Sequence, residues 1–111
     1  MVALYLDSGD WQMIHKYASE VDGFTTNPSL LRNAGAMDYR AFSRMALMVS
    51  EPKPISFEVF ADDESGMEAQ AIVLNSWGKH VYVKIPITNT KGESTGELIR
   101  KLSVSGIKVN V

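Results

Sequence analysis

The sequence contains no cysteine. This absence excludes a disulfide framework and thiolate chemistry, and it makes a reducing, cytoplasmic location the expectation. An excess of positive charge is missing too, because the formal net charge is −2. Nucleic acids and anionic membrane surfaces are bound by basic surfaces, so we expect neither as a partner. Long apolar runs are also absent: segments such as AIVL (71–74) are far shorter than the roughly 18 residues of a membrane span.

Patterns typical of metal and phosphate sites are equally scarce. His15 and His80 have no ligand spacing around them, so we expect no metal site. The acidic run at 62–64 precedes a predicted helix, and the helix dipole favours negative charge there, which explains the run better than cation binding does. The segment KGESTGE (91–97) has glycines before a helix but lacks the lysine spacing of a phosphate-binding loop. We interpret it as a capped loop.

Strand-like and helix-like segments alternate along the 111 residues, which predicts one α/β domain. Because the order begins with a strand, it predicts a parallel sheet. Two Ser-x-x-Glu patterns, Ser65–Glu68 and Ser94–Glu97, have the spacing of capping boxes and predict helix starts. The predicted strands are 2–7, 21–26, 55–60, 80–87 and 107–111, and the predicted helices are 9–20, 29–35, 38–50, 65–77 and 98–105.

Each predicted strand has one apolar face and one face that carries a polar residue. In the fourth strand, for example, Val81, Val83 and Ile85 alternate with Tyr82 and Lys84. In a doubly wound sheet helices cover both faces, so one-sided polarity favours a barrel whose polar faces point inward. The polar residues lie at or near the carboxyl ends of the strands, where such barrels have their active sites. They are Asp7, Asn27, Glu58, Lys84 and Asn110.

Lys84 is the candidate nucleophile of this group. A lysine amine can form a Schiff base with a carbonyl substrate. Asp7 and Glu58 are carboxylates that can transfer the protons such chemistry requires. Asn27 and Asn110 carry donors and acceptors suited to sugar hydroxyls. A purely structural, ion-paired Lys84 is the alternative.

Five segments carry the resemblance to a known family: LYLDSGD, DGFTTNPSLL, PISFEVFADD, VYVKIPIT and GIKVNV. In their order and spacing, and above all in the pair TTNPSL and VKIP, the whole chain resembles the transaldolase family. The likeness is greatest to the small members, which also include fructose-6-phosphate aldolases. The resemblance implies an eight-stranded (β/α) TIM barrel, chemistry through a Schiff base, and no cofactor.

The resemblance also implies roles for individual residues. Lys84 matches the Schiff-base lysine, Asp7 the aspartate that handles protons during carbon–carbon cleavage, and Glu58 the glutamate that acts through a water in Schiff-base formation and release. Residues around the bound dihydroxyacetone unit are matched by Thr25, Asn27 and Asn110.

Glu58, where the aldolase subgroup tends to have glutamine, and Asn110 favour transaldolase. That enzyme transfers dihydroxyacetone from a ketose phosphate (sedoheptulose 7-phosphate or fructose 6-phosphate) to an aldose phosphate in the pentose phosphate pathway. The alternative is a fructose-6-phosphate aldolase-like lyase.

The sequence departs from the family where it stops, in the fifth strand. The threonine expected after KVNV is missing, as are strands six to eight, which carry the family's phosphate-binding arginine and serine. We therefore expect residues 1–111 to be the N-terminal part of such a barrel, a truncated or half barrel with two open sheet edges. Open edges favour pairing with another chain, so we expect a homo-oligomer or association through these edges. Without phosphate anchoring we expect weak catalysis. A non-catalytic half-barrel or assembly fragment is the second reading.

Overall fold

The computed structural model describes residues 2–26 and 39–111. The chain divides into two compact units, Met1–Ser56 and Phe57–Val111, and each is described by itself. The predicted helix 29–35 and the candidate residue Asn27 lie outside the described residues.

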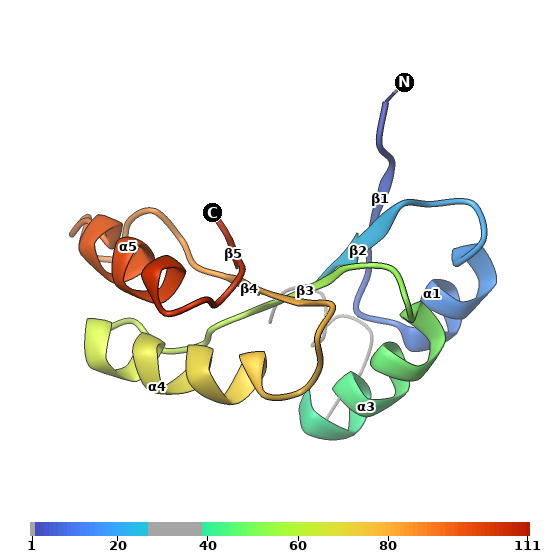
Figure 1. Cartoon of the computed structure of the whole chain (residues 1–111), viewed down its shortest axis with the longest axis horizontal. Helices are drawn as coiled ribbons and strands as arrows, with labels where there is room; N and C mark the ends of the chain where they lie inside the picture. The colour runs from blue at the N-terminus through green and yellow to red at the C-terminus, as the bar shows by residue number, and fades with distance from the viewer. Residues whose placement is uncertain (1, 27–38) are drawn as a thin grey trace. The chain divides into compact units, whose positions relative to one another are not determined.

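Strands and helices alternate as predicted, and five strands form one sheet in sequence order (Figure 1). The fold is therefore α/β with a five-stranded parallel sheet. The third strand begins in the first unit and ends in the second. The elements are β1 (Tyr5–Asp7), α1 (Trp11–Tyr17), β2 (Gly23–Thr25), α3 (Tyr39–Ser50), β3 (Ile55–Glu58), α4 (Glu64–Asn75), β4 (Val81–Lys84), α5 (Gly96–Val104) and β5 (Val109–Asn110).

The core of the first unit lies between its strands and two helices that run side by side, α1 and α3 (Figure 1). Phe24 and Ile55 are fully buried on neighbouring strands. Ile14 of α1 is fully buried too, and Phe42 of α3 is 6% exposed. Burying one such side chain contributes roughly 1.5–3 kcal/mol, so these four apolar residues hold the helices against the strands.

The core of the second unit is built in the same way. Phe57, Val81 and Val83 on β3 and β4 are fully buried. Phe57 also meets the Trp77 ring edge-on, with ring centroids 5.5 Å apart. The helices supply the remaining buried side chains of this core, which are Met67, Ala71 and Leu74 of α4 and Leu98 and Leu102 of α5.

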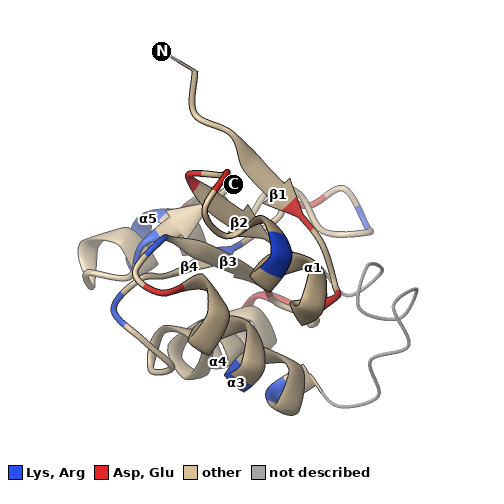
Figure 2. Cartoon of the chain, turned by 90° about the vertical axis from the view of Figure 1, so that its right-hand side faces the viewer, with Lys and Arg blue, Asp and Glu red and all other residues tan. Residues whose placement is uncertain are grey.

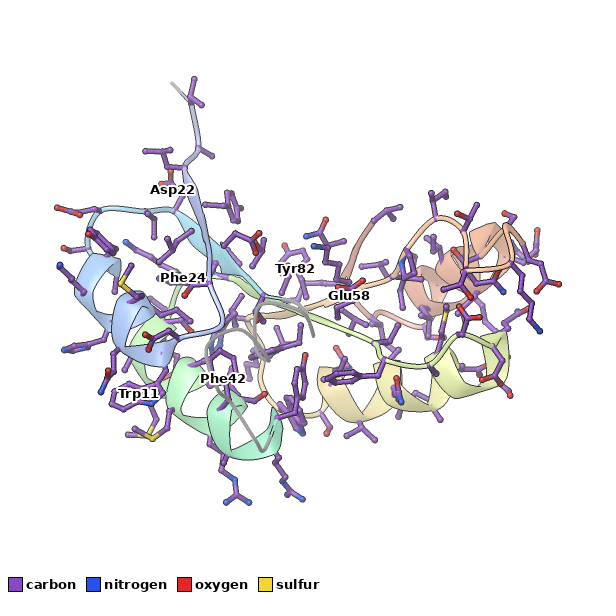
Figure 3. All side chains as sticks on the ribbon, turned by 180° about the vertical axis from the view of Figure 1, so that it is seen from behind. Trp11, Asp22, Phe24, Phe42, Glu58 and Tyr82 are labelled. Carbon is purple, nitrogen blue, oxygen red and sulfur yellow. The ribbon has the colours of Figure 1, made fainter. Side chains whose placement is uncertain are left out.

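Burial follows the predicted alternation on β4 but not on β3, where Ser56 is buried together with its neighbours Ile55 and Phe57. On β4, Val81 and Val83 are fully buried, whereas Tyr82 and Lys84 are half-buried. Figure 3 shows the labelled side chains Glu58 and Tyr82 on the side of their strands away from α4. The apolar faces therefore pack on helices, and the polar faces point the other way.

Alternation along the predicted strands 2–7, 80–87 and 107–111 would also place three further apolar residues on the packed face, but they are exposed. Leu4, Ile87 and Val111 are 61%, 58% and 62% exposed. Each lies beyond the paired part of its strand. In the fourth strand the cause is Pro86, which has no N–H to continue the ladder. The Pro86 and Ile87 carbonyls instead accept hydrogen bonds from Thr95.

Both predicted capping boxes were wrong, although both helices form. The N-cap of α4 is Asp63, whose carboxylate accepts from the Gly66 N–H at 3.1 Å, and Ser65 donates to the same carboxylate. Aspartate is as good an N-cap as serine, so the first suitable residue takes the position. The N-cap of α5 is Thr95, and its hydroxyl donates to the Pro86 carbonyl instead of capping the helix. The Ser94 hydroxyl does accept from the Gly96 N–H at 3.1 Å, so this predicted residue contacts the first turn of α5 without being its N-cap.

Within the described ranges, no helix combines the length and the apolar character needed to cross a bilayer.

Candidate active site

Three of the predicted site residues form a lateral row across the second unit. Lys84 on β4 is the register partner of Asn110 on β5. On the other side of β4, the Val59 N–H donates to the Lys84 carbonyl at 3.2 Å. In a parallel ladder this bond places Glu58, the last residue of β3, opposite Lys84. Neighbouring strands lie about 4.8 Å apart, so the acid, the amine and the amide occupy adjacent positions at one end of three strands.

The same face carries two residues that were not among the predicted site residues. Tyr82 lies two residues before Lys84, and Lys108 lies two residues before Asn110. The Lys108 ammonium lies 5.3 Å from the centroid of the Tyr82 ring and donates to the Lys79 carbonyl. Strand alternation alone could have identified both, because they share the parity of Lys84 and Asn110. A second lysine on this face is therefore already engaged by an aromatic ring and a carbonyl.

Asp7 and Thr25 come together in the first unit. They are register partners at the ends of β1 and β2, and the Thr25 hydroxyl donates to the Asp7 carboxylate at 2.8 Å. Figure 2 shows an acidic ribbon segment, in red, at the end of β1. The last residue of β1 is Asp7. The carboxylate is exposed, and the threonine holds one of its oxygens. This leaves the other oxygen free to accept or donate a proton.

The predicted site residues that the structure describes thus fall into two groups, the Asp7–Thr25 pair and the row Glu58, Lys84 and Asn110. Each of the five is the last residue of its strand, the position predicted for Asp7, Glu58, Lys84 and Asn110. Convergence of Asp7 with Lys84 in one pocket stays a prediction.

The loops that follow β3 and β4 are joined by a set of hydrogen bonds that we call the Asp62 clasp (Asp62, Asn89 and Thr90). Thr90 donates to the Asp62 carboxylate twice, from its N–H at 2.8 Å and from its hydroxyl at 2.6 Å. Asn89 donates to the Asp62 carbonyl at 3.2 Å. The two Thr90 donors stabilise the charged carboxylate and hold the pKa of Asp62 below its ordinary value of 3.8.

The acidic run at 62–64 has the helix role predicted for it. Asp63 caps α4 and Glu64 lies in its first turn. The Ser65 hydroxyl and the Gly66 N–H lower the pKa of the Asp63 carboxyl below its ordinary value of 3.8. Among the described residues, no group of three or more His, Asp or Glu side chains is arranged to hold a metal ion.

Fold and site together define a class of protein: an α/β protein of parallel strands whose polar side chains, a lysine among them, lie at the carboxyl ends of the strands. Enzymes with a TIM barrel have their active sites at this end. The model of one such family, described as transaldolase/fructose-6-phosphate aldolase, matches residues 4–111. The chain belongs to this family.

Individual relatives agree with this assignment. A probable transaldolase of Dehalococcoides mccartyi is 33% identical over 110 residues, which cover 97% of this chain and 49% of the relative. A probable transaldolase of Maridesulfovibrio salexigens is 35% identical over 109 residues, covering 96% of this chain and 48% of the relative. A probable transaldolase of Methanococcus maripaludis has the same identity and coverage. The chain therefore spans about half the length of the curated relatives that it matches.

Proposed function

We propose that this chain contributes the Schiff-base half of a transaldolase site. Lys84 is the nucleophile, and its substrate is a ketose phosphate such as fructose 6-phosphate or sedoheptulose 7-phosphate. The product is a dihydroxyacetone unit carried by the lysine and passed to an aldose phosphate. The observation that carries the proposal is the row Glu58, Lys84 and Asn110, because it sets an acid and an amide on either side of the amine.

The chemistry assigns one task to each member of the row. The Lys84 amine adds to the ketose carbonyl, and loss of water gives an iminium ion. Glu58 exchanges protons, through a water, with the departing and the returning hydroxyl. Asn110 holds a hydroxyl of the dihydroxyacetone unit by its amide.

The Asp7–Thr25 pair would act in the step that breaks the carbon–carbon bond of the substrate. Asp7 takes the proton from the hydroxyl next to the scissile carbon–carbon bond, and the electrons of that bond flow into the iminium ion. The hydrogen bond from Thr25 fixes the direction of the carboxylate. This step requires Asp7 and Lys84 to face one substrate molecule.

Reductive trapping tests the nucleophile directly. The 111-residue chain is incubated with fructose 6-phosphate or dihydroxyacetone and reduced with borohydride, and its intact mass is measured. We expect a mass gain equal to the ketone trapped less one oxygen atom. Lys84→Ala removes the adduct, and Lys84→Arg removes it while keeping the positive charge. Lys108→Ala, on the same face, leaves it in place.

The outcomes separate the alternatives. A folded, monodisperse oligomer that forms no adduct and binds no sugar phosphate supports the non-catalytic reading. An adduct that releases glyceraldehyde 3-phosphate without passing dihydroxyacetone to an acceptor aldose supports the aldolase reading, which the family description also names. Transfer to the acceptor supports transaldolase.

A further inference from the structure

The loop that carries the chain from Lys84 into α5 is built around the side chain of Asn89. The Asn89 carbonyl oxygen accepts from the N–H groups of Lys91 and Glu93 at 3.0 and 2.9 Å. Its amide nitrogen donates to the Glu93 carboxylate at 2.9 Å. Thr88 and Ser94 pair as an antiparallel bridge across the base of the loop. The loop therefore has its own ordered framework.

This framework is fixed to the neighbouring loop by the Asp62 clasp. Both Asp62 carboxylate oxygens receive a hydrogen bond from Thr90. The loop that contains Asp62 is in turn anchored to α4, because Gln70 accepts from the N–H groups of Phe60 and Ala61 at 2.7 and 2.9 Å. A continuous chain of contacts thus runs from α4 through Asp62 to Thr90.

The clasp joins the two loops that directly follow the proposed acid and nucleophile. Asp62 lies four residues after Glu58, and Thr90 lies six residues after Lys84. β3 and β4 are neighbours in the sheet, so a bond between their loops restrains the separation of their last residues.

We infer that Asp62 is a positioning residue: through Thr90 it fixes the loop after β4 and thereby the geometry of Lys84 relative to Glu58. The inference rests on the proposed function of that pair. Both Asp62 oxygens are already occupied by Thr90, so the carboxylate acts by holding the loop and not by taking a substrate proton.

Two acidic neighbours provide a matched comparison. Asp62→Ala removes the two Thr90 bonds of the clasp and leaves the bond from Asn89 to the backbone carbonyl of residue 62. Asp63→Ala removes a carboxylate one residue away that caps α4 and touches Ser65 and Gly66. Asp62→Asn keeps an oxygen for the Thr90 N–H and an amide that can donate to the Thr90 hydroxyl. The asparagine variant should therefore restore most of what alanine loses.

The experiment measures the rate of borohydride trapping, the melting temperature and hydrogen exchange over residues 85–95. We expect Asp62→Ala to slow trapping between about 10-fold and 100-fold, the usual effect of a small misplacement of reacting groups. Exchange in residues 85–95 should become faster. Asp63→Ala should lower the melting temperature, but its adduct should be trapped at the wild-type rate. The trapping rate of Asp62→Asn should stay within about threefold of the wild-type rate.

Several results would overturn the inference. One is that Asp62→Ala forms the borohydride-trapped adduct at the wild-type rate. Another is that hydrogen exchange over residues 85–95 in Asp62→Ala is the same as in wild type. A third is Asp63→Ala slowing trapping as much as Asp62→Ala does. If wild type forms no adduct, the proposed function fails by itself, and the exchange data still decide whether Asp62 fixes the loop. Thr90→Val, which removes one of the two bonds, gives a second, milder variant should Asp62→Ala unfold.

Discussion

Among the residues of the proposed site, Glu58 has the position that matters most for the proposed Schiff-base reaction at Lys84. The bond from the Val59 N–H to the Lys84 carbonyl sets it opposite the lysine, and its side chain is half-buried on the polar face. A carboxylate at this place can move protons in both the addition and the dehydration steps. Glutamine has the same shape but cannot do so.

We therefore expect Glu58→Gln to slow Schiff-base formation at Lys84 by roughly 10²–10⁴-fold, the range of general acid–base catalysis. The time course of reductive trapping measures this rate. Glu68→Gln is the control, because Glu68 of α4 forms an ion pair with Lys101 of α5 at 3.0 Å and takes no part in the proposed site. Equal rates for Glu58→Gln and wild type would remove Glu58 from the mechanism.

At the scale of single elements, α5 ends where Gly106 adopts a left-handed backbone with φ of +91°. A Cβ added there would meet no atom within 4 Å, so the cost of a side chain lies in the backbone alone. We expect Gly106→Ala to destabilise the chain by about 1–2 kcal/mol. Gly96→Ala, at the first residue of α5, is the control: its backbone is not left-handed, and the added Cβ would lie 3.3 Å from the Ser94 hydroxyl oxygen, a side-chain atom that can move. It should therefore destabilise the chain less than Gly106→Ala does. Urea denaturation compares the two, and equal effects would contradict the backbone explanation.

We expect the loop that carries Asp62 and Asp63 to make the stability of the second unit depend on pH in the acid range. Their pKa values are lowered in the folded chain, by hydrogen bonds from Thr90 and from Ser65 and Gly66 respectively. The unfolded chain therefore binds more protons as the pH drops below the ordinary value of 3.8. Their stabilising effect is fully present above that pH and is lost as the pH falls through the folded pKa values.

We expect Asp62→Asn to show a smaller loss of melting temperature than wild type between about pH 4 and pH 2. The asparagine has no charge to lose in that range. Scanning calorimetry at several pH values measures the difference. Parallel pH curves for the two chains would mean that the Thr90 bonds do not favour the charged form.

At the scale of the whole chain, the order of the elements and the parallel sheet could be predicted because they depend on local pattern. Period-two alternation correctly predicted the buried side of β4, whereas on β3 Ser56 is buried as well as Ile55 and Phe57. It also predicted that Glu58, Lys84 and Asn110 lie on the polar faces of their strands, near the carboxyl ends. The helix starts could not be read in the same way, because Asp63 and Ser65 both suit an N-cap and only the fold decides between them. The Asp62 clasp joins residues 28 apart in sequence, so no local pattern signals it.

The chain spans about half the length of the relatives that it matches. The outer strands of the sheet are β1 and β5. We expect these two edge strands to pair with another chain. Light scattering over a range of concentrations measures the assembly, and a strict monomer would contradict this expectation.

The central claim is that Lys84, and no other lysine, is the amine that meets a ketose. Peptide mapping after borohydride reduction with fructose 6-phosphate tests it most directly. The account predicts the label on the peptide that contains Lys84 and none on the peptide that contains Lys108, the other lysine of that face. Label spread over the exposed lysines, or concentrated at Lys108, would contradict it.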